Sequence, residues 1–160
     1  MTAITADLRH IMNAQDSFDM SASERDQLYE ESTVGPIPVG DTLGTALLTS
    51  GIVGRLFAVY ARLTSWQGKV FDPVRGELLN KVSPFGIRAI RAKVYVGDSL
   101  QVKGQQAIII DYSTTSFIAR QIRDEIRMVA PGLYLGKAFW GPRHVLDFCL
   151  SQEPGKDSSI

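Results

Sequence analysis

Apolar and polar residues alternate with a period of two through most of the chain beyond residue 65. This period is typical of β-strands that turn one face toward a core. Short runs rich in Gly, Pro, Asp and Ser separate the alternating segments and predict tight turns. The sequence therefore predicts a curved antiparallel sheet of six strands, which are WQGKVF, GELLNKV, Ile87–Val96, Gln106–Tyr112, Gly132–Trp140 and His144–Leu150.

Helical periodicity, with apolar residues three or four positions apart, occurs in three segments. In the leader 1–33 it predicts two short helices, the second of which begins with a capping box formed by Ser21 and Glu24. A buried helix is predicted over 52–63, where apolar residues widen one face beyond a stripe. In SFIARQIRDEIRMV, the apolar residues fall on one stripe and the rest is charged, which predicts a short amphipathic helix before the fifth strand.

These elements predict one domain over 1–150, with the helical leader at 1–33 and a barrel over 34–150. Two Pro and four Gly make 34–51 an extended loop, with one strand around Thr45–Leu48. The tail 151–160 is small and polar, and we expect it to be disordered.

Alternation also predicts which side chains face the barrel interior. The third strand places Arg88 on the same row as its apolar residues Ile90, Ala92, Val94 and Val96. The last strand places His144 on one row with Leu146, Phe148 and Leu150. The fifth strand leaves two rows open, and if Tyr134, Gly136, Ala138 and Trp140 face inward, the two small residues leave room for a ligand.

Composition excludes several classes of function. The 17 Lys and Arg residues balance 17 Asp and Glu residues, so no overall charge draws the chain to nucleic acid. No apolar run approaches the length of a membrane span, and with a single Cys we expect a soluble cytoplasmic protein. Two distant His residues predict no metal site, and the chain has neither a phosphate-binding loop nor a GxSxG motif, so we expect no cofactor.

Four polar residues lie on strands that otherwise favour apolar ones, namely Lys69, Asn80, Arg88 and Asp111. A charge that faces the interior of a small barrel is costly unless it is paired or meets a ligand. One interpretation is that these side chains pair with each other or face solvent. The other is that they orient the polar end of an apolar ligand, as sparse polar groups do in small-molecule pockets.

Further candidates come from the rim and from the aromatic residues. Arg123 and Asp124 either belong to a solvated face or lie at the rim, where they would fasten the segment to the barrel. Trp66 and Trp140 are either core residues or ligand contacts. Tyr112 and Tyr134 add phenol groups that can donate or transfer a proton. We predict catalysis at Asp111, Lys69, Tyr112 or Tyr134, with Asp111 the first choice because it ends an apolar strand. The ligand-binding candidates are Trp66, Asn80, Arg88, Arg123, Asp124, Trp140, His144 and Phe148.

The motifs WQGKVFD, PFGxRAIxAKVY, IDYSxTS, IRDEIRxVAPGLYLG and FWG resemble those of a family of small, largely uncharacterised microbial proteins with a lipocalin-like, or calycin-like, barrel. The resemblance covers about Val34 to Leu150. Proteins of this broad structural type include carriers of apolar metabolites and cofactor-free cyclases and isomerases of secondary metabolism. The polar closing segment with His144 departs from the usual pattern of the family.

The function expected on this basis is that of a cofactor-independent cyclase or isomerase, for example one that performs a Diels–Alder-type pericyclic cyclisation of an apolar polyketide- or terpenoid-like metabolite. An apolar pocket would fold the substrate, and one or two polar groups would stabilise charge or move a proton. The alternative is a non-catalytic carrier of a small hydrophobic ligand. Both require the same pocket, so the sequence leaves both open.

Overall fold

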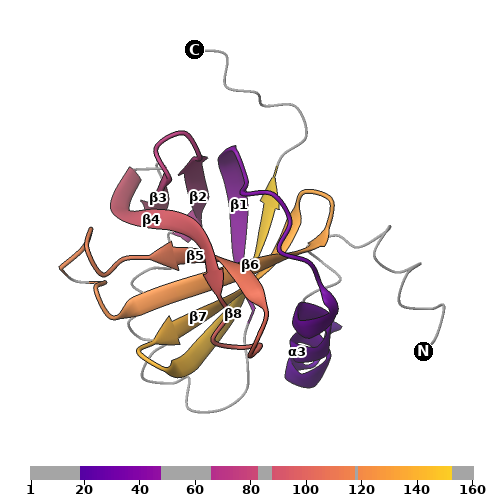
Figure 1. Ribbon diagram of the computed structural model, residues 1–160. Helices are drawn as coiled ribbons and strands as arrows, with labels where there is room; N and C mark the ends of the chain where they lie inside the picture. The colour runs from indigo at the N-terminus through magenta and orange to yellow at the C-terminus, as the bar shows by residue number, and fades with distance from the viewer. Residues whose placement is uncertain (1–18, 48–65, 83–87, 118, 153–160) are drawn as a thin grey trace.

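A computed structural model describes residues 19–47, 66–82, 88–117 and 119–152 of the chain. These residues form one helix and eight strands, and the strands close into an antiparallel barrel in which each strand pairs with its neighbours in sequence (Figure 1). The protein is thus mainly β, with a barrel of the lipocalin-like class, as predicted. The elements are α3 (Ala22–Glu31), β1 (Gly40–Leu47), β2 (Trp66–Asp72), β3 (Glu77–Val82), β4 (Arg88–Asp98), β5 (Gln106–Asp111), β6 (Ile122–Ala130), β7 (Leu133–Trp140) and β8 (Arg143–Gln152).

The closure of the barrel depends on β1, which pairs with β2 through Gly40 and Asp41 and with β8 through the following residues up to Leu47. Because of this closure, each of the eight described strands has a paired neighbour on both sides. Most of the predicted strand around Thr45–Leu48 lies in this element, which begins earlier, at Gly40, and ends at Leu47. The predicted helix over 52–63 and the first leader helix lie outside the described residues.

The amphipathic helix expected before the fifth strand is not formed, and this prediction was wrong. Ile122–Ala130 is instead strand β6, paired with β5 and β7. The misleading signal was the spacing of Ile122, Ile126 and Val129, which also suits a strand that is buried on both faces. Glu125 and Arg127 point away from the interior yet are buried, because α3 and neighbouring loops cover that side of the barrel.

The C-terminal boundary also differs from the prediction. Ser151 and Gln152, assigned above to a disordered tail, continue β8, where they pair with Leu43 and Thr42 of β1. Their polar side chains gave no signal for a strand, but their backbone groups are used in closing the barrel. The rest of the tail lies outside the described residues.

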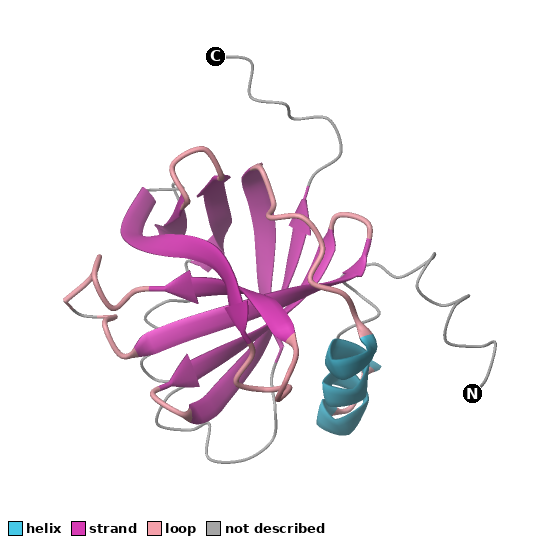
Figure 2. Ribbon diagram, viewed as in Figure 1, coloured by secondary structure: helices cyan, strands magenta, loops and turns pink. Residues whose placement is uncertain are grey.

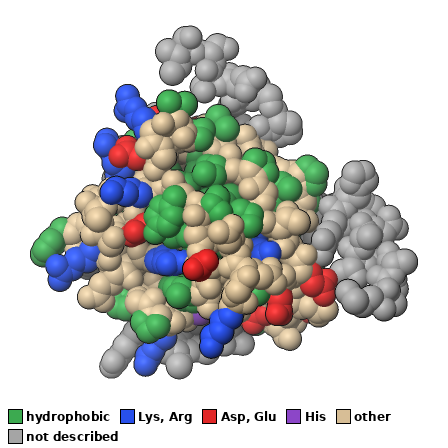
Figure 3. All heavy atoms as spheres, in the orientation of Figure 1, with side chains coloured by type: hydrophobic (Ala, Val, Ile, Leu, Met, Phe, Trp, Pro, Cys, Tyr) green, Lys and Arg blue, Asp and Glu red, His purple; other side chains and the backbone are tan. Residues whose placement is uncertain are grey.

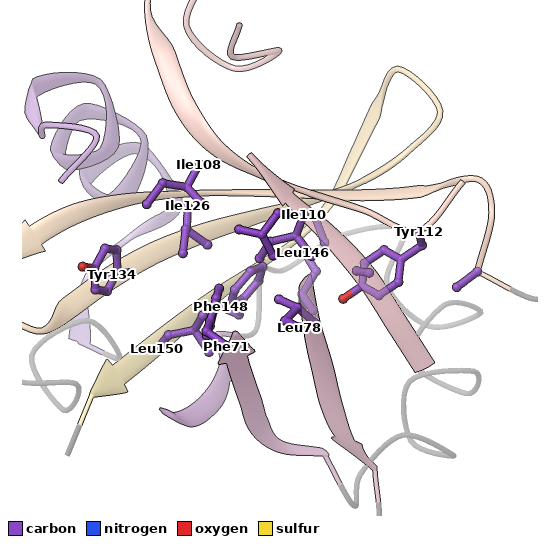
Figure 4. Packing of buried hydrophobic residues seen from close by; sticks show 14 residues of the cluster. Phe71, Leu78, Ile108, Ile110, Tyr112, Ile126, Tyr134, Leu146, Phe148 and Leu150 are labelled. Carbon is purple, nitrogen blue, oxygen red and sulfur yellow. The ribbon is translucent and has the colours of Figure 1, made fainter. Parts of the chain in front are cut away.

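The barrel interior is an apolar core, and its two ends differ. At one end, which we call the strap end, residues 33–39 cross the barrel, with Val34 and Ile37 packed against the core. Tyr134 donates a hydrogen bond of 2.7 Å to the Pro36 carbonyl, which anchors this segment. We call the opposite end the polar end; β5 finishes there, followed by Tyr112. In Figure 4 Tyr112 and Tyr134 lie at opposite ends of the packed side chains.

The strap also depends on one glycine. Gly35 has φ +69°, a conformation that side chains rarely adopt, and a Cβ there would clash with Met128 of β6. Thr33 forms a bridge to Met128 at the same place. The strap therefore lies directly on the barrel wall.

Helix α3 lies against the outside of the barrel (Figure 2). Its capping box forms as predicted, since the Ser21 hydroxyl accepts from the Glu24 amide and Glu24 accepts from the Ser21 amide. Few of its residues are apolar, and Arg25, Leu28 and Tyr29 are the buried ones. Asp and Glu side chains gather over this helix on the face shown in Figure 3. None of the helices in the described part of the chain is long and apolar enough to cross a membrane.

Candidate functional site

Four polar side chains meet inside the barrel toward the polar end. The Lys69 ammonium donates to Asn80 Oδ1 at 2.8 Å, to the Tyr112 hydroxyl at 2.7 Å and to Asp124 Oδ2 at 3.0 Å. Asn80 Nδ2 donates to the Tyr112 hydroxyl at 2.8 Å, and that hydroxyl donates to Asp124 Oδ2 at 3.2 Å. All four side chains are buried. We call this group the inner polar cluster.

Strand alternation explains how these residues meet. Lys69 shares the inward row of β2 with Phe71, and Asn80 shares that of β3 with Leu78. Lys69 and Asn80 are direct cross-strand partners. Asp124 lies opposite Ile110 and Ala138 on the inward row of β6.

A strained backbone position adjoins the cluster. Ile90 has φ +55°, which is an outlier for a β-branched residue and costs about 1–3 kcal/mol. It lies at the register shift between β3 and β4. Asn80 Nδ2 donates to the Ile90 carbonyl at 3.2 Å, so the same amide joins the cluster to this bulge.

Electrostatics keep the phenol of Tyr112 neutral. Burial raises its pKa well above the usual 10, and the negative charge of Asp124 raises it further. Tyr112 thus acts in the cluster as a hydrogen-bond donor rather than as an anion. The Lys69 ammonium also lies 5.5 Å from the ring centroids of Tyr112 and Phe148, an attractive cation–π distance.

Most of the remaining interior is filled by side chains. In the half of the barrel near the strap, Phe71, Leu78, Ile108, Ile126, Tyr134 and Leu150 are each at most 3% exposed. A space the size of a water molecule beside these side chains would expose them, so the interior next to them is filled.

The room predicted over Gly136 is likewise occupied. Gly136 faces inward, and the Phe148 ring lies against it where a Cβ would be. At the polar end, the inward side chains of Ala138 (9%), Leu146 (7%) and Asn80 (6%) keep some exposure. At the strap end, Val94 (6%) and the partly buried Met128 do so as well. The sequence left open which of two rows of β7 faces inward, and the structure shows that it is the row with Tyr134 and Ala138.

The other candidates are distributed over the barrel. Asp111, the first choice for catalysis, points outward, where it accepts hydrogen bonds from Tyr95 and the Ser113 amide. Burial alone would raise its pKa, but the bonds from Ser113 and Tyr95 lower it below the usual value. Tyr134 lies in the interior at the strap end, away from the cluster. Burial raises the pKa of its phenol.

His144 does not lie on the inward row, so that prediction was wrong. The pairing of β7 with β8 shifts register between Ala138 and Phe139, which adds Val145 as an extra residue on β8. Val145 packs against the interior, and His144 turns outward, where its Nε2–H donates a hydrogen bond of 2.8 Å to Asp147 Oδ1. A bulge of this kind has no reliable signal in a single sequence.

The remaining candidates include both exposed and interior residues. Trp140 ends β7 and is 43% exposed at the polar end. Arg123 points outward and bonds to the Asp98 carbonyl. Phe148 is an interior residue, as predicted. Trp66 and Arg88 begin β2 and β4, and their side chains are not among those described.

Sequence reasoning missed a second polar layer, between α3 and the barrel wall. Asp147 accepts from Arg25 Nε at 2.9 Å and from Lys137 Nζ at 2.9 Å, and Glu125 accepts from the Tyr29 hydroxyl at 3.1 Å. We call this the outer polar layer. Its signal was the charge on the outward rows of β6, β7 and β8, which reads equally well as a solvated face.

The inner polar cluster is suited to holding a polar group or moving a proton. Carboxylate, phenol and ammonium groups in an apolar enclosure interact more strongly than in water. Among the described residues, no group of three His, Cys, Asp or Glu side chains is placed to hold a metal ion.

Comparisons with known proteins bear on the fold. No protein-family model matches the chain, and no curated protein matches it. A crystal structure of a protein from Thermomonospora curvata is similar, with a TM-score of 0.64 and 18% sequence identity over 87% of this chain and 92% of that chain. This likeness supports the barrel fold, and the family resemblance stays a prediction.

Proposed function

We propose that this protein binds a small, largely apolar molecule at the polar end of the barrel, with the polar group of the molecule against the inner polar cluster. The observation that carries the proposal is the cluster itself, a buried Lys69–Asp124 ion pair inside an otherwise apolar barrel. Buried ion pairs are weak contributors to stability, and convergent polar groups in an apolar enclosure are typical of ligand sites. The filled strap half directs the ligand to the polar end.

The proposal is tested with N-phenyl-1-naphthylamine, a neutral probe whose fluorescence rises in apolar surroundings. Wild-type protein should bind it saturably. Ala138→Phe, which fills the exposed part of the inward face of β7, should weaken binding at least about tenfold, and Ala138→Leu provides a milder variant if the larger one does not fold. Leu43→Phe is the matched control, because Leu43 is 50% exposed on the outside of β1. Equal loss in the control, or no saturable binding by the wild type, would refute the proposal.

The second candidate is catalysis of an isomerisation or cyclisation without a cofactor. The Asp124 carboxylate favours this candidate, because it lies beside the neutral phenol of Tyr112 in an apolar enclosure. Such surroundings suit a group that accepts a proton from a substrate. In this mechanism Asp124 and Tyr112 do the chemistry, and the Lys69 ammonium, 3.0 Å from Oδ2, positions the Asp124 carboxylate. The small exposure of Ala138, Leu146 and Asn80 at the polar end favours a small substrate over a long polyene.

The catalytic candidate is tested with 3-cyclohexen-1-one, whose conversion to 2-cyclohexen-1-one by proton transfer is followed by ultraviolet absorbance. Wild-type protein should exceed the uncatalysed rate, and Asp124→Asn should lower the rate about a hundredfold or more. Asp111→Asn, on the outer face, is the control and should not change it. A wild-type rate equal to background would leave the carrier function standing and exclude this chemistry for the probe.

A further inference from the structure

The polar hydrogens of the inner polar cluster are all donated within the protein. Lys69 uses its three N–H donors on Asn80, Tyr112 and Asp124. Asn80 Nδ2 donates to the Ile90 carbonyl and to Tyr112, and the Tyr112 hydroxyl donates to Asp124. The cluster therefore has no donor to spare for a ligand.

An acceptor remains. Both hydrogen bonds to the Asp124 side chain end on Oδ2, and Oδ1 accepts none from the residues that the structure describes. Oδ1 is not fully buried, and the Asp124 side chain as a whole is 8% exposed. Its neighbours across the strands are Ile110 and Ala138, both apolar.

From this asymmetry we infer that the ligand carries a neutral hydrogen-bond donor, such as an alcohol or phenol hydroxyl, which bonds to Asp124 Oδ1. The inference rests on the proposed binding site and names the chemical class that it selects. A cationic amine fits less well, because the Lys69 ammonium 3.0 Å from Oδ2 already neutralises the carboxylate and would repel a second cation. A carbonyl or ether fits less well because two acceptors would meet.

The test compares four probes of one shape, namely naphthalene, 2-naphthol, 2-methoxynaphthalene and 2-naphthylmethylamine, by displacement of N-phenyl-1-naphthylamine at pH 7. A hydrogen bond to a charged acceptor should make 2-naphthol bind at least about tenfold more tightly than the other three. Equal binding of all four, or tightest binding of the amine, overturns the inference and leaves the proposed site standing. Failure of all four to bind overturns the proposed site as well.

A variant sharpens the test by reversing the preference. In Asp124→Asn, the Lys69 ammonium and the Tyr112 hydroxyl both require the amide oxygen, so the amide NH₂ group should face the ligand. The variant should then prefer 2-acetylnaphthalene, an acceptor, over 2-naphthol, whereas the control Asp111→Asn should keep the wild-type order. If Asp124→Asn folds, as its circular dichroism will show, and still prefers 2-naphthol, the donor does not bond to Asp124 and the inference is wrong. If it does not fold, the wild-type comparison alone decides.

Discussion

At the scale of single residues, small changes in the interior have large effects because the strap half is filled. Gly136 and Phe148 show this most clearly, since the aromatic ring takes the place of the missing side chain. The sequence indicated an inward Gly136 on one of two open rows. It could not show that a residue of the neighbouring strand uses the space, because that depends on the register of β7 and β8.

Replacing Gly136 by Ala should therefore destabilise the protein by about 1–3 kcal/mol or more, since the new methyl group overlaps the Phe148 ring. Urea unfolding measures the change. The double variant Gly136→Ala/Phe148→Leu should recover part of the loss relative to the sum of the single changes. If the two single effects simply add, the ring does not occupy this space.

The Lys69–Asp124 pair makes a second prediction at this scale. Lys69→Met removes one partner of a buried ion pair and should cost about 3–5 kcal/mol in unfolding free energy, because the Asp124 charge is left without its ammonium. Lys69→Met/Asp124→Asn removes both charges and keeps an acceptor for Tyr112, so it should be more stable than Lys69→Met alone. A double variant less stable than the single one would contradict the pairing.

At the scale of elements, the sequence predicted the strands with clear alternation and turns, and it failed where burial on both faces hid the period. β6 looked helical because its apolar residues have helical spacing and the residues between them are charged. Glu125 and Arg127 are outward yet buried beside α3, and alternation cannot distinguish such a covered face from a solvated one. Lys69, Asn80, Tyr112 and Asp124 were all named from the sequence, since polar residues on apolar strands are conspicuous. Their assembly into one cluster, and the outward position of Asp111, required the register of the whole barrel.

The docking of α3 on β8 predicts a specific pH dependence. Burial alone would raise the pKa of Asp147, but hydrogen bonds from His144, Arg25 and Lys137, with the charge of Lys137, hold that pKa well below its usual value of 3.8. A depressed folded-state pKa stabilises the fold above the unfolded value, and this stabilisation is lost as pH falls below about 4. Asp147→Asn should thus cost about 3–5 kcal/mol at pH 7 and progressively less in acid.

Urea unfolding of wild type and Asp147→Asn from pH 7 to pH 3 tests this. Asp72→Asn serves as the control, because Asp72 ends β2 on the surface with its side chain 47% exposed. A difference between wild type and Asp147→Asn that is constant with pH would mean that the Asp147 pKa is not depressed in the folded state.

At the scale of the whole molecule, the two ends of the barrel interior differ in their side chains. The strap, Tyr134 and the apolar core fill one end, and the inner polar cluster lies toward the other, where inward side chains keep some exposure. Filling one half of an eight-stranded barrel is compatible with holding one small ligand in the other. The central claim is therefore one of location: a ligand binds at the polar end.

Nuclear magnetic resonance measures this location directly, through the ¹H–¹⁵N amide shifts of the full chain during titration with 2-naphthol. The largest shifts should occur at Tyr112, Asp124, Ala138 and Leu146, which surround the polar end, and the amides of Phe71, Leu78 and Leu150 near the strap should change little. Saturable shifts concentrated at the strap end, or no saturable shifts at all, would contradict the account.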